Sequence, residues 1–95
     1  MKKNFRVLVS DKISQKALDT LQKNNIDFDY KPDCGTSDTL IQVIEPYTGL
    51  IIRSASKVSK EVIDRGKNLQ VIGRAGIGVD NIDLKAATSK GLSLI

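Results

Sequence analysis

The sequence predicts an α/β fold, in which a parallel sheet of about five strands, in the order 2-1-3-4-5, carries helices on both faces. Short apolar segments of strand length alternate along the chain with longer segments of helical periodicity. Such alternation is typical of strand–helix–strand units that are joined by right-handed crossovers. The chain has 95 residues, of which 40% are hydrophobic, so we expect one small globular domain.

Five segments have the length and composition of strands. The segment 49–52 is a continuous apolar run, as expected for a central parallel strand that is covered on both faces. The segment 27–30 alternates aspartate with aromatic residues, which favours a strand at the edge of the sheet. The other strands are expected at 5–9, 69–72 and 92–95. This number of strands and this connectivity predict a flavodoxin-like arrangement.

Four helices are expected between the strands, because each helical segment has a start and a stop signal. Side chains that can accept a hydrogen bond from a backbone N–H precede the four segments, and they are Ser14, Thr36 or Ser37, Ser59 and Asp83. Residues that end a helix follow the last three segments, and they are Pro46, Gly66 and Gly91. The first helix is expected to end near Asn24 and Asn25.

An arginine stands at the carboxyl end of two strands that the predicted order places side by side. Arg53 follows the strand 49–52, and Arg74 lies in a glycine-rich turn after the strand 69–72. Because ligands of open parallel sheets bind beyond the carboxyl ends of the strands, we expect both guanidinium groups to face one site. Such a site suits a carboxylate or a phosphate. Asp11 is expected near the same edge, where we interpret it as a turn residue rather than a catalytic one.

The glycine-rich turn is only partly similar to the fingerprint of dinucleotide-binding proteins. That fingerprint has three glycines directly after a strand and an acidic residue about 20 positions further on. Here Asn81 stands where the third glycine would be, and the acidic position would fall near or past Ile95. We therefore do not expect this turn to bind a pyrophosphate by itself.

The composition argues against several classes of function. The net charge is +4, but the 15 basic residues are scattered, and no run of them indicates a nucleic-acid-binding arm. Cys34 is the only cysteine, so neither an intrachain disulfide nor a cysteine metal cluster is expected, which is typical of a cytoplasmic protein. The chain has no histidine, the commonest acid–base group near neutral pH. No signal peptide or membrane span is recognisable, and no metal site is expected.

Three stretches together resemble the D-isomer-specific 2-hydroxyacid dehydrogenases, and most strongly those that act on 3-phosphoglycerate. They are Arg-Ser-Ala-Ser-Lys-Val at 53–58, Val-Ile-Gly-Arg-Ala-Gly-Ile-Gly-Val-Asp-Asn-Ile-Asp at 71–83, and Ala-Ala-Thr at 86–88 with Gly91. The resemblance covers essentially the whole chain in order. It implies an NAD-dependent oxidoreductase that converts 3-phosphoglycerate to 3-phosphohydroxypyruvate, the first step of the phosphorylated route to serine.

The resemblance also implies which part of such an enzyme this chain represents. Residues 1–95 would be a single domain, the N-terminal part of the substrate-binding domain, without the NAD-binding domain. The catalytic histidine and its glutamate partner would lie in the absent part, so no catalytic residue is expected here and the chain alone is expected to be inactive. The implied substrate contacts are Arg53, Ser54, Ala55, Arg74, Ala75 and Gly76. Ile77 would approach the nicotinamide end of NAD through a backbone or apolar contact only.

In the resembled family a further helix, from beyond Ile95, covers part of the sheet. We therefore expect a fold that is truncated before its last helix, with Val7, Val9 and Leu94 open on one face. An open apolar face usually finds a partner, which predicts a homo-oligomer.

Two other functions remain as alternatives. The first is a free-standing flavodoxin-like module that binds a small anion or acts in signalling. A phosphoacceptor receiver would need an aspartate where Arg53 stands, and a flavin module would need a phosphate-binding loop where Ser10, Asp11 and Lys12 stand. The second is a nucleic-acid-binding protein, which only the net charge favours.

Overall fold

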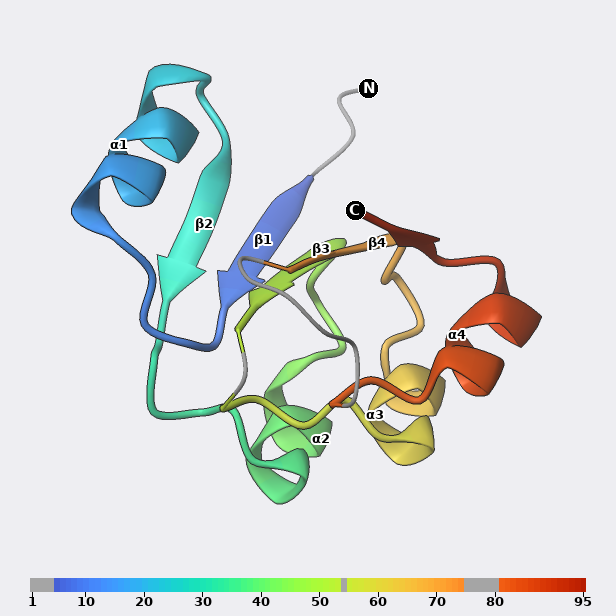
Figure 1. The fold of residues 1–95 in the computed structure, drawn as a ribbon. Coiled ribbons are helices and arrows are strands. Elements are labelled where there is room, and N and C mark those ends of the chain that lie inside the picture. The colour runs from blue at the N-terminus through green and yellow to red at the C-terminus, as the bar shows by residue number, and fades with distance from the viewer. Residues whose placement is uncertain (1–4, 54, 75–80) are drawn as a thin grey trace.

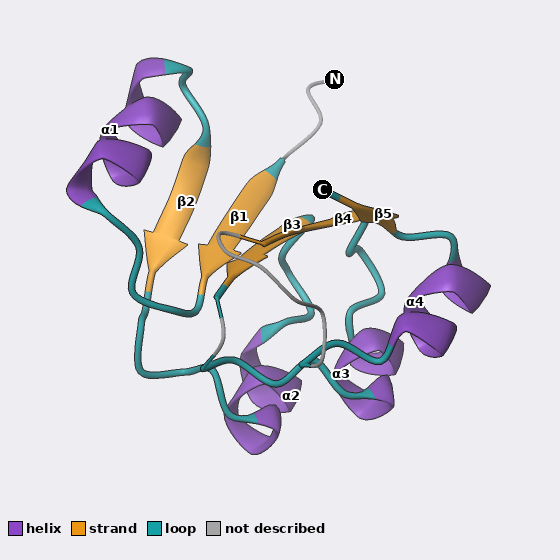
Figure 2. Cartoon of the chain, in the orientation of Figure 1, coloured by secondary structure: helices purple, strands orange, loops and turns teal. Residues whose placement is uncertain are grey.

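The structure is a computed structural model that describes residues 5–53, 55–74 and 81–95. Its core is one sheet of five strands, all parallel, in the order β2-β1-β3-β4-β5. The strands are β1 (Arg6–Val9), β2 (Asp27–Tyr30), β3 (Gly49–Ile52), β4 (Val71–Arg74) and β5 (Ser93–Leu94). This arrangement confirms the predicted fold class and strand order, with β2 at one edge (Figures 1 and 2).

Among the residues that the structure describes, four helices connect the strands. They are α1 (Gln15–Lys23), α2 (Ser37–Val43), α3 (Lys60–Arg65) and α4 (Leu84–Lys90). Figure 1 shows α2, α3 and α4 below the sheet and α1 on the other side, next to β2. None of the helices in the described part of the chain is long and apolar enough to cross a membrane.

The expected helix starts are confirmed, because the four helices have side-chain caps at or next to the predicted residues. The N-caps are Ser14, Thr36, Ser59 and Asp83, each of which accepts a hydrogen bond from a backbone N–H of the first turn. Of the two candidates for α2, Thr36 is the cap and Ser37 is the first helical residue. Gly91 ends α4 with φ of 79°, a left-handed conformation that glycine adopts without strain.

The main core lies between the sheet and the three helices α2, α3 and α4. Leu8, Leu50 and Ile72 point from adjacent strands into this core, and each is at most 1% exposed. Residues in neighbouring positions of a strand point to the opposite face. The main core therefore packs on one face of the sheet, and the alternate residues of each strand lie on the opposite face.

The expectation that Val7 and Val9 lie open on that other face is wrong, because they are only 5% and 0% exposed. Val7 is enclosed by its neighbours in the sheet: its side chain and those of Phe5 and Val71 all surround the position where Gly49 would carry a Cβ. Leu94 is partly buried against the core.

Strand β4 also differs from the expectation, which placed it at 69–72 with Arg74 in a following turn. The strand begins at Val71 and continues through Gly73 to Arg74. Gly73 pairs with Ile51 of β3, and the Arg74 N–H donates to the Ile95 carbonyl at 2.9 Å. Pairing on both sides keeps the backbone extended, so Arg74 is the last residue of a strand.

Candidate functional site

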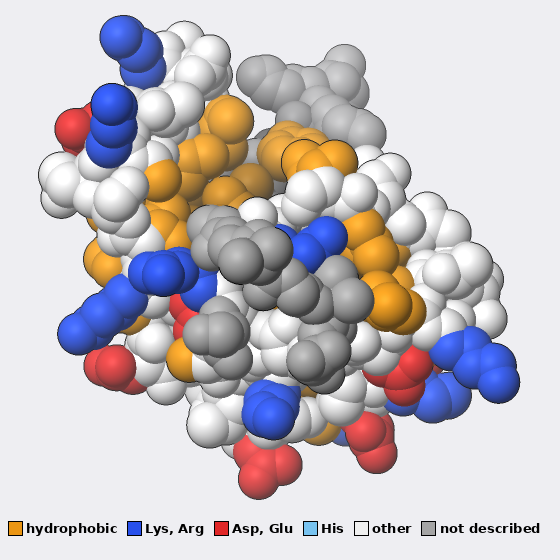
Figure 3. All heavy atoms as spheres, in the orientation of Figure 1, with side chains coloured by type: hydrophobic (Ala, Val, Ile, Leu, Met, Phe, Trp, Pro, Cys, Tyr) orange, Lys and Arg blue, Asp and Glu red, His pale blue; other side chains and the backbone are white. Residues whose placement is uncertain are grey.

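The two arginines lie at the same edge of the sheet, at the carboxyl ends of neighbouring strands. Arg74 is paired with Ile52, the last residue of β3, and Arg53 follows Ile52 directly. Arg53 is exposed and its Nη1 donates to the Lys12 carbonyl at 3.3 Å, whereas Arg74 is partly buried. Figure 3 shows lysine and arginine side chains spread over this face, some of them near its middle and below a group of apolar side chains, with acidic side chains along the lower rim. The arrangement confirms the expected closeness of the two strand ends.

The backbone groups of Arg53 and Ser56 are held by two side chains, Asp11 and Asn81. Asp11 Oδ2 accepts hydrogen bonds from the backbone N–H groups of Arg53 and Ser56, at 2.5 and 3.0 Å. Asn81 Nδ2 donates to the carbonyl oxygens of the same two residues, at 2.6 and 2.9 Å. Asp11 is only 2% exposed, so its carboxylate is part of the interior rather than of a solvated turn.

Further contacts fix the chain around Ser56. Its hydroxyl shares a 2.7 Å hydrogen bond with the Ser10 hydroxyl, and both side chains are fully buried. The next residue, Lys57, donates from its backbone to the Gly35 carbonyl at 2.8 Å. Val58 then forms an isolated parallel bridge with Ile82. The loop after β3 is therefore tied to the end of β1, to the loop before α2 and to the segment before α4.

The structure describes three of the seven residues that the sequence assigned to the site. Arg53 and Ala55 are exposed and Arg74 is partly buried, all near the carboxyl edge of β3 and β4. Ser54, Ala75, Gly76 and Ile77 lie outside the described residues. Sequence reasoning missed Asn81 as part of the site, and it interpreted Asp11 as an ordinary turn residue.

The N-terminus of α4 does not fit a dinucleotide. A pyrophosphate in a dinucleotide-binding fold sits on the free N–H groups of the helix that follows the glycine-rich turn. Here Asp83 caps that helix, and its Oδ1 accepts from the Ala86 N–H at 3.0 Å. The carboxylate occupies the position of the anion and carries the same charge sign. The cap therefore places a negative charge at the N-terminus of α4, whereas most of the glycine-rich turn before it lies outside the described residues.

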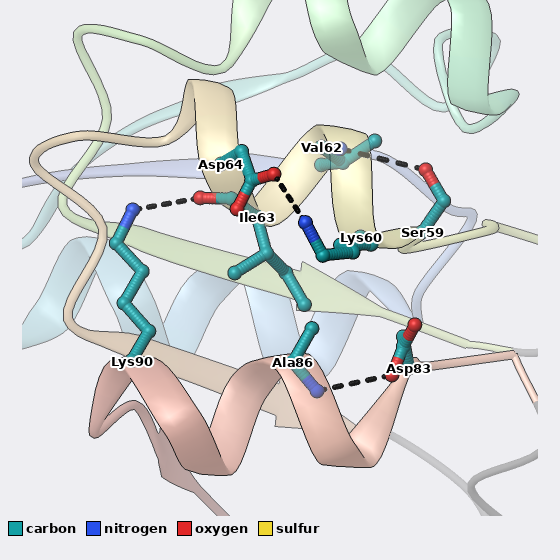
Figure 4. Close-up of polar contacts among 8 residues, drawn as sticks. All are labelled: Ser59, Lys60, Val62, Ile63, Asp64, Asp83, Ala86 and Lys90. Atoms are coloured by element: carbon teal, nitrogen blue, oxygen red, sulfur yellow. Dashed lines mark hydrogen bonds and ion pairs between the residues drawn. The ribbon is translucent and has the colours of Figure 1, made fainter.

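A second surface feature is a groove of about 500 Å³ between α3 and α4, in which Lys60, Asp64 and Lys90 form contacts within the protein (Figure 4). Lys60 and Asp64 pair with each other at 3.0 Å. Lys90 Nζ donates to the carbonyls of Ile63 and Gly66, both at 2.7 Å, at the end of α3. The two Lys90 bonds join α4 to α3, and we regard the groove as structural.

Three side chains elsewhere, Cys34, Asp29 and Tyr47, have shifted pKa values with structural causes. Burial raises the pKa of the Cys34 thiol, which keeps it protonated and makes it a poor nucleophile. On β1 and β2, the hydrogen bonds from Arg6 and from the Tyr47 hydroxyl lower the pKa of Asp29. Burial and the bond to Asp29 raise the pKa of Tyr47 to about 12. Within the described part of the chain, acidic and cysteine side chains form no group of three that could hold a metal ion.

Comparison with known sequences identifies one family. Residues 7–95 match the profile described as D-isomer specific 2-hydroxyacid dehydrogenase, catalytic domain. Over 91 residues the chain is 42% identical to D-3-phosphoglycerate dehydrogenase of Archaeoglobus fulgidus and 37% identical to hydroxypyruvate reductase of Thermotoga maritima. Each alignment covers 96% of this chain, which spans only 17% of the first protein and 29% of the second.

Solved structures show the same fold. A crystal structure of a Pyrococcus horikoshii protein superimposes with a TM-score of 0.87 at 30% identity, over 97% of this chain and 27% of that one. The NAD+-bound 3-phosphoglycerate dehydrogenase of Entamoeba histolytica gives a TM-score of 0.83 at 24% identity, over 98% of this chain and 32% of that one.

Proposed function

Because this chain belongs to the D-isomer specific 2-hydroxyacid dehydrogenase family, we propose that it is the N-terminal part of the substrate-binding domain of an NAD-dependent D-3-phosphoglycerate dehydrogenase. The parent enzyme would oxidise 3-phosphoglycerate to 3-phosphohydroxypyruvate, the first step of phosphorylated serine synthesis. The similarity to the Archaeoglobus fulgidus protein supports this choice of substrate within the family.

The observation that carries the proposal is the pair of arginines at adjacent strand ends. 3-Phosphoglycerate has a carboxylate at one end and a phosphate at the other, and a guanidinium group can bind either with two parallel hydrogen bonds. Arg53 starts from a fixed backbone beside β3, and Arg74 starts one register position away on β4. We propose that the two side chains bind the anionic ends of one substrate molecule.

The other proposed contacts surround these two arginines. Ser54 and Ala55 would contact the substrate next to Arg53, and Ala75 and Gly76 would line the same pocket with backbone N–H groups. Such amides are suitable donors to a carboxylate. Ile77 would make only a backbone or apolar contact near the nicotinamide end of NAD.

The chain would bind and orient the acid, whereas the chemical step needs groups from elsewhere in the parent enzyme. Oxidation of the 2-hydroxy acid removes a proton from the hydroxyl group and a hydride from the carbon that bears it. The 95 residues contain no histidine to accept the proton. The α4 N-terminus does not fit the pyrophosphate of NAD, because Asp83 caps it. We therefore assign substrate binding, and no catalytic group, to this chain.

Titration of the chain with 3-phosphoglycerate, followed by NMR, tests the proposal. Arg53→Ala and Arg74→Ala should each weaken binding roughly 30-fold or more, because loss of one charge-assisted pair costs about 2–4 kcal/mol. Arg65→Ala is the matched control, since Arg65 is an exposed arginine on α3, away from this edge, and its loss should leave the affinity unchanged.

Two ligands make the test specific for the substrate. Inorganic phosphate should bind much more weakly than 3-phosphoglycerate, because it engages only one anionic subsite. Equal binding of the two, or wild-type affinity in both arginine variants, would contradict the proposal. Comparable binding of D-glycerate, which lacks the phosphate, would instead favour a substrate like that of the Thermotoga maritima relative, a hydroxypyruvate reductase.

A further inference from the structure

We propose that Asp11 and Asn81 are positioning residues for substrate binding, because together they fix the backbone from which Arg53 extends. The inference rests on the proposed function for the role of Arg53. Asp11 is the second residue after β1, and Asn81 lies just before α4. Although 70 positions separate them, both side chains bond to the same two residues, Arg53 and Ser56.

The two side chains have complementary polarity. One carboxylate oxygen of Asp11 accepts both N–H groups, and one amide nitrogen of Asn81 donates to both carbonyl groups. The donor and the acceptor of each end residue are therefore both used. Asp11 Oδ2 bonds to both N–H groups, and Asn81 Nδ2 bonds to both carbonyl groups. Each side chain therefore fixes the distance between Arg53 and Ser56 independently of the other.

The surroundings prevent the segment from shifting away from Asp11. Ser56 is fully buried, and its hydroxyl is bonded to that of Ser10. Gly35 packs so closely on Ser56 that an added Cβ would lie 2.6 Å from the Ser56 Oγ. Burial of a carboxylate is costly unless it is fully hydrogen-bonded. Breaking the bonds of Asp11 to the Arg53 and Ser56 N–H groups would therefore be unfavourable.

Fixing this backbone affects the arginine directly. Arg53 has a long, exposed side chain, and binding has to restrict its rotamers. Asp11 holds the N–H of Arg53, Asn81 holds its carbonyl, and its Nη1 is bonded to the Lys12 carbonyl. The side chain of Arg53 therefore has fewer conformations to lose when an anion binds. Such preorganisation increases affinity without any contact between the positioning residues and the ligand.

Near-isosteric substitutions separate hydrogen bonding from side-chain volume. Asp11→Asn keeps an acceptor oxygen, whereas Asp11→Ala removes it. Asn81→Asp keeps the shape but turns the donor into an acceptor that faces two carbonyls. Thr48→Val is the control for lost stability, because Thr48 is buried and accepts from the Arg6 N–H at the opposite edge of the sheet.

The affinity of each variant for 3-phosphoglycerate gives the first measurement. Asp11→Ala and Asn81→Asp should weaken binding about tenfold or more, while Asp11→Asn and Thr48→Val should stay within about threefold of the wild type. In an Arg53→Ala background, Asp11→Ala should cause a clearly smaller loss than in the wild type, since most of the effect of Asp11 passes through Arg53. Wild-type affinity in Asp11→Ala, or additive losses in the double variant, would overturn the inference.

Hydrogen exchange of the Arg53 and Ser56 amides gives the second measurement, and it does not depend on any ligand. Exchange at both amides should be about tenfold faster or more in Asp11→Ala than in Thr48→Val. If the wild type failed to bind 3-phosphoglycerate, the proposed function would fall, and exchange alone would then decide whether Asp11 and Asn81 fix this segment. Unchanged exchange in Asp11→Ala would refute that role.

Discussion

Substitution of Gly35 by alanine should destabilise the fold through one close contact. Gly35 is buried, and a Cβ added to it would lie 2.6 Å from the Ser56 Oγ, 3.1 Å from the Ser56 Cα and 3.2 Å from the Ser10 carbonyl oxygen. Two of these three atoms belong to the backbone and cannot rotate away. Rotation of the Ser56 hydroxyl would break its 2.7 Å bond to the Ser10 hydroxyl inside the protein.

The size of the effect follows from these contacts. Overpacking of a well-filled site costs about 1–3 kcal/mol, and a buried hydroxyl left without its partner costs about 1–3 kcal/mol. The lower entropy of the unfolded alanine chain offsets about 0.4–1 kcal/mol. We expect Gly35→Ala to lower the free energy of unfolding by about 2–4 kcal/mol, a large part of the roughly 5–15 kcal/mol typical of a domain.

Urea denaturation measures this change, and Gly73→Ala is the matched control. A Cβ on Gly73 would lie 3.8 Å from the nearest atom, an ordinary contact, so that variant should be as stable as the wild type or slightly more so. With a slope of about 1–3 kcal/mol per molar urea, the midpoint for Gly35→Ala should fall by about 1–2 M. A midpoint equal to that of Gly73→Ala would refute the reasoning.

Three further results are expected. The pKa of Tyr47 is raised to about 12, so its neutral form stabilises the fold fully below pH 10, and this contribution is lost as the pH rises towards about 12; absorbance titration should show one late-ionising tyrosine that Tyr47→Phe removes. Lys90→Met should cost about 1 kcal/mol in urea denaturation, because Lys90 bonds to two carbonyls at the end of α3, whereas Lys60→Ala should cost nothing measurable, because its pair with Asp64 is exposed. The chain alone should show no turnover of 3-phosphoglycerate, and calorimetry should show no micromolar affinity for NAD. Turnover, or micromolar binding of NAD, would contradict the proposal that this chain contributes only substrate binding.

The elements that could be predicted from the sequence are those with local signals. The strands 27–30 and 49–52 and the caps Ser14, Ser59 and Asp83 agree with the structure, because alternation, apolar runs and capping residues act within a few positions. The ends of β4 could not be predicted in this way. They depend on pairing with β3 and with the residues around β5, which lie about 20 positions away on either side.

The same limit explains which parts of the candidate site were missed. The closeness of Arg53 and Arg74 follows from the strand order alone, and it could be predicted. The role of Asn81 could not, since its partners Arg53 and Ser56 lie 28 and 25 positions earlier in the chain. Asp11 was interpreted as a turn residue because its position after a strand is typical of one; its burial arises only when the segment 53–56 folds over it.

The position of β1 between β2 and β3 has a consequence for the order in which the protein forms during synthesis. Strand β1 is synthesised before its two neighbours in the sheet, β2 and β3. It can be paired on both sides only after Gly49–Ile52 has left the ribosome. Arg53 and Ser56 emerge next, when Asp11 has already been synthesised and can accept their N–H groups. Their second set of bonds forms only after Asn81 has emerged, some 25 residues later. The bonds around Arg53 are thus completed late, and a nascent chain that stalls between Ser56 and Asn81 would present Arg53 on a backbone that is held from one side only.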